Sequence, residues 1–145
     1  MTDVSHLASL VRYCSPNTVK DGIPIDNAFW VRPAEEYLSV NVLPGDLGVE
    51  DGLVQIRKIL AKKEFGTSTN GRFAVFNAGR VMQHMREYGM SVKVEHRPSP
   101  DDPTHASIAP AGRYDADAWY KSTRIMARAL SQFLRDNPGS VYLVR

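Results

Sequence analysis

Two histidines flank a proline-rich segment of this 145-residue chain. Their spacing is the pattern in the sequence that most strongly indicates a catalytic site. His96 precedes residues 97–104 (RPSPDDPT), His105 follows them, and Asp102 lies inside the segment. If the flanking residues pair as a β-hairpin, the two imidazoles fall near opposite positions, with Cβ atoms about 5 Å apart. Two imidazoles and a carboxylate in one place suit general acid–base catalysis or the binding of a divalent metal.

The histidine pair predicts a reaction class. One imidazole can take a proton from an oxygen while the other donates one, as metal-independent cleavage of a phosphodiester requires. Arg97 or Arg113 would hold the phosphate and stabilise the charge that develops on it. The catalytic residues of this hypothesis are His96, His105 and Asp102.

The same residues also have a structural interpretation. Asp and Pro are common in turns, because the carboxylate bonds nearby backbone and proline fixes φ. A histidine at the end of a strand can also simply bond a carbonyl. The spacing matches no zinc motif, since the chain has no H-E-x-x-H and only one cysteine. Residues 105–107 (HAS) match half of the paired H-x-S/T pattern of the two-histidine phosphoesterases, but the second half is missing, so no family is assigned. We expect no metal and no cofactor.

A stripe of cations lies on the last predicted helix, residues 115–136. At about 100° per residue, one side of this helix is apolar and the opposite side carries cations at helical spacing, with no acidic residue among them. Such a stripe fits a phosphate backbone or another acidic macromolecule, and an ordinary solvated face is the alternative. The stripe consists of Lys121, Arg124, Arg128 and Arg135.

A second basic patch lies on an earlier predicted helix and consists of Lys58, Lys62 and Lys63. Exposed lysines are common on helices, so this patch strengthens the stripe only if both share one surface. The net charge of the whole chain is +2, from 18 Lys and Arg against 16 Asp and Glu. A sum this small indicates no partner by itself.

Hydrophobic periodicity predicts the elements that position these residues. Strands are predicted at residues 28–32, 37–43, 73–76, 91–96, 105–109 and 141–144, with residues 33–36 as a hairpin loop between the first two. Helices are predicted at residues 53–64, 77–89 and 115–136, the second capped by Asn77 and closed by Gly89. Strands outnumber helices, and helices do not alternate regularly with strands, which predicts an α+β fold. We expect a mostly antiparallel sheet with about three helices packed on it, in a single domain over residues 1–145.

The single cysteine and the start of the chain set the expected compartment. Cys14 has no partner for a disulfide, and we expect a small buried side chain on a strand. The first residues lack the basic and apolar regions of a secretory signal. No apolar run approaches the roughly 20 residues that cross a bilayer. These observations predict a cytoplasmic protein with no membrane partner.

Three functions follow from the residues alone. The first is a small intracellular binding or accessory protein whose basic stripe, with Lys58 and Lys62, contacts nucleic acid or another acidic macromolecule. The alternative is a small metal-independent hydrolase or nuclease acting on phosphodiesters, with His96 and His105 as its acid–base pair. A subunit of a larger protein assembly is the third.

Overall fold

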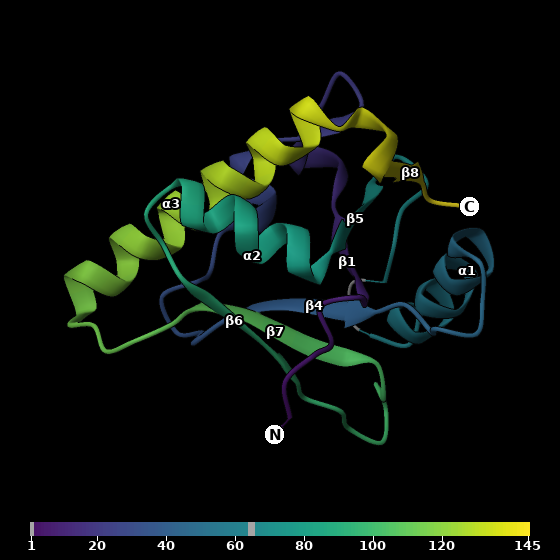
Figure 1. The fold of residues 1–145 in the computed structure, drawn as a ribbon. Helices are drawn as coiled ribbons and strands as arrows, with labels where there is room; N and C mark the ends of the chain where they lie inside the picture. Colours follow the sequence, from purple (N-terminus) through teal and green to yellow (C-terminus); the bar gives the residue numbers. More distant parts are fainter. Residues whose placement is uncertain (1, 64–65) are drawn as a thin grey trace.

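Eight strands form two sheets in the computed structural model, which describes residues 2–63 and 66–145. The strands are β1 (Ser9–Cys14), β2 (Val19–Lys20), β3 (Ile23–Pro24), β4 (Leu38–Val42), β5 (Arg72–Asn77), β6 (Val92–His96), β7 (His105–Pro110) and β8 (Val141–Leu143). The large sheet has the order β6-β7-β4-β1-β5-β8 (Figure 1). The small sheet consists of β2 and β3. Every strand pairing among the described residues is antiparallel.

Three α-helices accompany these strands: α1 (Val49–Leu60), α2 (Ala78–Glu87) and α3 (Ala116–Asp136). Three short 3₁₀ turns are η1 (Pro16–Thr18), η2 (Asp26–Phe29) and η3 (Pro138–Ser140). The side chains of Asn77 and Asp115 cap α2 and α3, accepting hydrogen bonds from backbone N–H groups of the first turn. Gly89 ends the α2 region at φ 73°, a left-handed conformation that glycine adopts without strain. The predicted α+β fold is confirmed.

The helices pack on opposite faces of the large sheet. Leu10 and Phe76 lie in one apolar cluster with Leu130 of α3, and α2 contributes to the same cluster. The neighbouring residue Val11 lies in a second cluster with Ile56 of α1, because alternate residues of a strand point to opposite faces. Figure 1 shows α2 and α3 together on one side of the sheet, with α1 apart from them.

The face that α1 covers changes character across the sheet. Over β1, β5 and β8 it is apolar and packs against the helix. On β4 and β7 the same face carries polar side chains, because the register pairs Ser39 with Ser107 and Asn41 with His105. Directly opposed residues share a face, so these four side chains lie together beside the α1 layer.

Two predicted elements differ from the structure. Residues 28–32 are not a strand paired with 37–43, since η2 covers Asp26–Phe29 and β4 already has β1 and β7 as neighbours on its two sides. The helix predicted at 53–64 begins at Val49, where Glu50 and Asp51 occupy its first turn, and ends at Leu60. The predicted end at Glu64 lies outside the described residues.

Two further predictions, the β6–β7 hairpin and a buried Cys14, are confirmed. The strands β6 and β7 pair on either side of the proline-rich segment, and Cys14 is buried at the end of β1. Among the described residues, no helix combines the length and the apolar character that crossing a membrane would need.

Candidate functional site

The imidazole of His105 is held on both sides. Nδ1 lies 3.0 Å from the backbone oxygen of Arg97, and Nε2 lies 3.2 Å from Oγ of Ser39. A carbonyl oxygen only accepts hydrogen bonds, so Nδ1 carries the hydrogen and Nε2 of the neutral ring accepts from the Ser39 hydroxyl. A serine hydroxyl that donates to an imidazole, itself oriented by a third group, is the arrangement of an activated nucleophile.

The side chain of Arg97 braces this arrangement. Its guanidinium carbon lies 4.1 Å from the centre of the Tyr37 ring, and Nε donates to Oγ of Ser107 at 2.8 Å. The Tyr37 ring in turn lies 5.9 Å from the ring of His105. The residue whose carbonyl orients His105 is therefore fixed by its own stacking and hydrogen bonding.

Arg12 reaches the site from β1. Nε donates to the backbone oxygen of Ala28 at 3.1 Å, and Nη1 donates to the backbone oxygen of Ser39 at 3.0 Å. Nη2 makes no hydrogen bond within the described part of the chain, and no described acidic residue forms a salt bridge with this guanidinium. Burial lowers the pKa of Arg12 from its ordinary value, although a guanidinium remains charged at neutral pH. The charge of Glu35 favours the cation, but no described carboxylate forms a salt bridge with it, so the guanidinium can still bind an anion.

These residues line a pocket of about 470 Å³, a volume within the range of small-molecule sites. Three cations border it, Arg12, Arg32 and Lys63. Lys63 pairs with Asp102, whereas Arg12 and Arg32 form no salt bridge among the described residues. Oδ1 of Asn27, another lining residue, is buried and has no hydrogen-bond partner among the described residues. The pocket therefore favours an anionic ligand with hydrogen-bonding groups.

Asp102 occupies a structural position next to this pocket. It is 3% exposed, and its carboxylate accepts from Nδ2 of Asn41 at 2.8 Å and pairs with Nζ of Lys63 at 2.7 Å. Thr104 completes this group of hydrogen bonds. The carboxylate thus joins the chain just after α1 to β4 and to the loop before β7, and it makes no hydrogen bond to the His105 ring.

The predicted pairing of His96 with His105 is wrong in register. His96 lies opposite Ala106, whereas His105 lies opposite Asn41. Since residues 105 and 106 point to opposite faces of the sheet, the two imidazoles do so as well. His96 borders a different surface hollow, with Thr2. No group of three or more His, Cys, Asp or Glu residues suited to a metal occurs among the residues the structure describes.

The basic stripe on α3 is only partly available to a partner. The guanidinium carbon of Arg124 lies 3.6 Å from the centre of the Trp30 ring and 4.9 Å from that of Tyr120. Arg135 bonds two side chains of its own helix, including Oγ of Ser131 at 2.9 Å. The other two stripe cations, Lys121 and Arg128, are exposed and form no salt bridge with any described residue.

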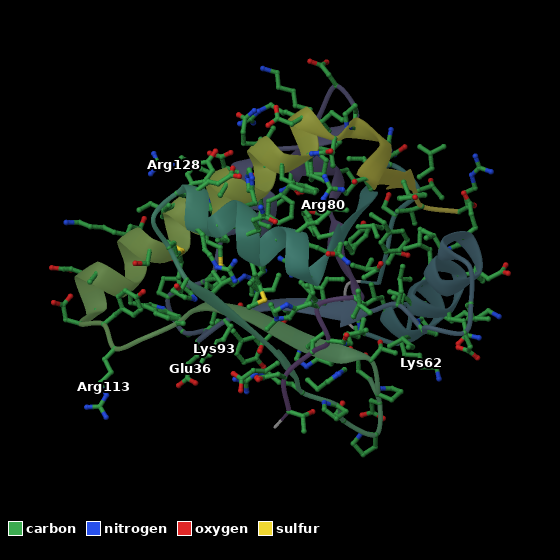
Figure 2. The ribbon with its side chains drawn as sticks, viewed as in Figure 1. Glu36, Lys62, Arg80, Lys93, Arg113 and Arg128 are labelled. Carbon is green, nitrogen blue, oxygen red and sulfur yellow. The ribbon has the colours of Figure 1, made fainter. Side chains whose placement is uncertain are left out.

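The two basic patches do not share a surface. Lys58 lies on α1 and Lys62 two residues beyond it, whereas the stripe lies on α3. The two helices pack against opposite faces of the sheet. Figure 2 shows Lys62 and Arg128 projecting from different sides of the molecule.

Sequence reasoning did not select Arg12, Ser39 or Asn41 for the site. A signal existed for each of them. Arg12 is the only charged residue in β1, which reads SLVRYC, and Ser39 and Asn41 alternate with apolar residues in β4, which reads LSVNV. Polar side chains at alternate positions of an otherwise apolar strand indicate a face that is not core.

Comparison of the chain with known protein families, with curated proteins and with solved structures found no match. The chemistry of the site therefore rests on its own geometry. That geometry combines a hydroxyl, an imidazole that accepts its hydrogen, and a neighbouring buried cation. These groups are the components for nucleophilic attack on an ester whose developing negative charge needs stabilisation.

Proposed function

We propose that the chain is a hydrolase of phosphodiesters in which Ser39 is the nucleophile and His105 the general base. The observation that supports this most directly is the continuous chain of contacts from the Arg97 carbonyl through the imidazole to the Ser39 hydroxyl, on the wall of a pocket with excess positive charge. The sequence predicts His105 as an acid–base residue of such a reaction. In this proposal its partner is the hydroxyl of Ser39 and not the imidazole of His96.

The proposed reaction has two steps, phosphorylation of Ser39 and hydrolysis of the phosphorylated serine. Oγ of Ser39 attacks phosphorus while Nε2 of His105 takes its proton, the bond from phosphorus to the leaving oxygen breaks, and that oxygen receives the proton from Nε2. A water molecule then attacks the phosphorylated serine, with His105 again accepting a proton and returning it to Oγ. The products are an alcohol and a phosphate monoester, and the enzyme is regenerated.

Arg12 stabilises the charge on the phosphoryl oxygens. Arg12 and Ser39 leave their strands on opposite faces of the sheet, but both line the same pocket, and Nη1 of Arg12 donates to the backbone oxygen of Ser39. This hydrogen bond fixes the guanidinium in the pocket wall, where its charge can act on a bound phosphate. Arg32 and Lys63 add positive charge at the rim. Because Lys63 is already paired with Asp102, we assign the larger part of the stabilisation to Arg12.

Hydrolysis of bis(p-nitrophenyl) phosphate by the purified chain tests this proposal. We expect release of p-nitrophenolate that falls about 100-fold or more in Ser39→Ala and in His105→Gln, since each removes half of the nucleophile–base pair. The matched control is His96→Gln, which changes a histidine on the other face of the sheet and should retain activity.

Two results would overturn the proposal. One is undiminished hydrolysis by Ser39→Ala, which would place the activity elsewhere. The other is equal loss in His96→Gln and His105→Gln, which would restore the two-histidine mechanism.

A second candidate is binding of an acidic macromolecule through α3, with nucleic acid as the favoured partner. It is supported by the exposed cations Lys121 and Arg128, which have no salt bridge among the described residues. Binding of a labelled single-stranded oligonucleotide should weaken steeply as salt rises. Reversal of both residues to Glu should abolish it, while Lys58→Glu and Lys62→Glu on the other side of the molecule should have little effect. Salt-independent binding would contradict this candidate.

A further inference from the structure

Trp30 forms an aromatic wall of the pocket that holds Arg12 and Ser39. The residue follows η2 directly and is 43% exposed, which is unusual for so large an apolar side chain. A tryptophan held at the edge of a cationic pocket offers a flat surface on which another ring can stack.

Arg124 of α3 fixes this wall. Its guanidinium carbon lies 3.6 Å from the Trp30 ring centre, so it covers one side of the ring in a cation–π contact. Nε of Arg124 is buried and has no hydrogen-bond partner among the described residues, and its second contact is the ring of Tyr120 at 4.9 Å. The guanidinium is therefore held by aromatic contacts, and it supports Trp30 from the side of α3.

Arg12 connects the aromatic wall to the proposed nucleophile. It bonds the backbone of Ala28, two residues before Trp30, and also the backbone of Ser39. Its charge thus lies between the segment that carries Trp30 and the strand that carries Ser39. Trp30, Arg12 and Ser39 all line the same pocket, so one ligand that stacks a ring on Trp30 and carries an anionic group can contact all three.

We infer that the phosphodiester accepted by this pocket is a nucleotide ester, with its base stacked on Trp30 and its phosphate at Arg12, and that Arg124 is the positioning residue for Trp30. This inference rests on the proposed function, because it names the substrate class of the same site. A pocket of about 470 Å³ has the size of a small-molecule site of this kind. Every base has a flat face that can stack, so the pocket tolerates different bases.

The first experiment compares two diesters with the same leaving group. Thymidine 5′-(p-nitrophenyl phosphate) carries a base, and methyl p-nitrophenyl phosphate does not. We expect kcat/KM to favour the nucleotide ester about tenfold or more. Trp30→Leu should remove that preference, because kcat/KM falls much further for the nucleotide ester than for the methyl ester, while Trp30→Phe retains much of the preference. Arg124→Met should reduce it through KM, with little change in kcat.

The second experiment measures binding without turnover. The chain has two tryptophans, so Trp119→Phe leaves Trp30 as the only one and also serves as the control for a tryptophan outside this pocket. Thymidine 5′-monophosphate should quench the emission of Trp30 and bind about tenfold more tightly than ribose 5-phosphate.

The outcomes separate this inference from the proposed function. Equal kcat/KM for both diesters, or equal affinity for both monophosphates, would overturn the nucleotide assignment and leave the hydrolase intact. Quenching by the nucleotide without hydrolysis of either diester would support the nucleotide site and overturn the hydrolase. A preference for the nucleotide ester that survives Trp30→Leu would show that the base binds elsewhere and would overturn the inference.

Discussion

Oγ of Ser39 and Nε2 of His105 lie 3.2 Å apart although 66 residues separate them in the chain. The sheet brings them together, because β4 and β7 are neighbours and their register places Asn41 opposite His105. Ser39 is thus the diagonal neighbour of His105 on the same face. The contact depends on a pairing of distant strands, and it supplies the nucleophile and the base of the proposed reaction.

Removal of the Arg12 guanidinium should lower phosphodiester hydrolysis much more than removal of a rim cation. Arg12→Met deletes a charge that is anchored to the backbone of Ser39, and we expect kcat to fall about 100-fold or more. Arg32→Met deletes an exposed cation of the same pocket and should cost less than about threefold. Steady-state kinetics on both variants measures the difference. Similar losses in the two would show that the pocket acts through its overall charge alone.

Loss of the Asp102 carboxylate should destabilise the fold. Asp102→Ala removes one of the two acceptors of Nδ2 of the buried Asn41, leaving only Oγ1 of Thr104, and it removes the ion pair that joins Lys63 to the β6–β7 loop. We expect the free energy of unfolding to fall by about 1–3 kcal/mol, measured by urea denaturation. Asp101→Ala, at the exposed neighbouring position, is the matched control and should change stability little. Equal stabilities of the two variants would contradict the structural role of Asp102.

Local patterns in the sequence predicted much of the fold. The apolar periodicity placed all three helices, and Asn77 was correctly identified as the cap of α2. The hairpin of β6 and β7 followed from alternating residues on both sides of a segment with three prolines. These features depend on neighbours in the chain, so the sequence contains the information directly.

The site depended on two features that local patterns do not contain. The first is register, since a shift of one residue moves a side chain to the other face of the sheet, and the loop at 97–104 does not fix that shift. His96 consequently lies opposite Ala106, on the face away from His105. The second is the pairing of β4 with β1 and β7, which brings the Ser39 hydroxyl to His105 and the Ser39 backbone oxygen to Arg12.

A methyl group at Gly71 should not fit. A Cβ atom there would lie 2.6 Å from the backbone oxygen of Cys14 and 2.8 Å from the Tyr13 hydroxyl, and the backbone cannot give way easily. We expect Gly71→Ala to lower the free energy of unfolding by about 1–3 kcal/mol. Gly45→Ala is the control, because nothing lies within 4 Å of a Cβ there and its φ is not positive. Thermal denaturation of both variants distinguishes them, and equal melting temperatures would contradict the close packing at Gly71.

Ionisation of Cys14 should make stability fall at alkaline pH. Burial raises the pKa of this thiol from 9.0 to about 12, and the nearby Arg12 cation offsets only part of that effect. Between these two values the unfolded chain releases the thiol proton while the folded chain keeps it. The stabilisation is therefore complete below pH 9 and is lost above it, at up to about 1.4 kcal/mol per pH unit.

The variant Cys14→Ala isolates this effect, because it lacks the thiol and keeps the other titrating groups. Urea denaturation of both proteins from about pH 8 to about pH 10.5 should show the stability advantage of the native chain decreasing by about 2 kcal/mol. An advantage that stays constant across this range would mean that the thiol ionises equally in the folded and unfolded chains. Burial also predicts that Cys14 reacts slowly with Ellman's reagent in the native protein. Fast reaction, together with a constant advantage, would show that solvent reaches the thiol.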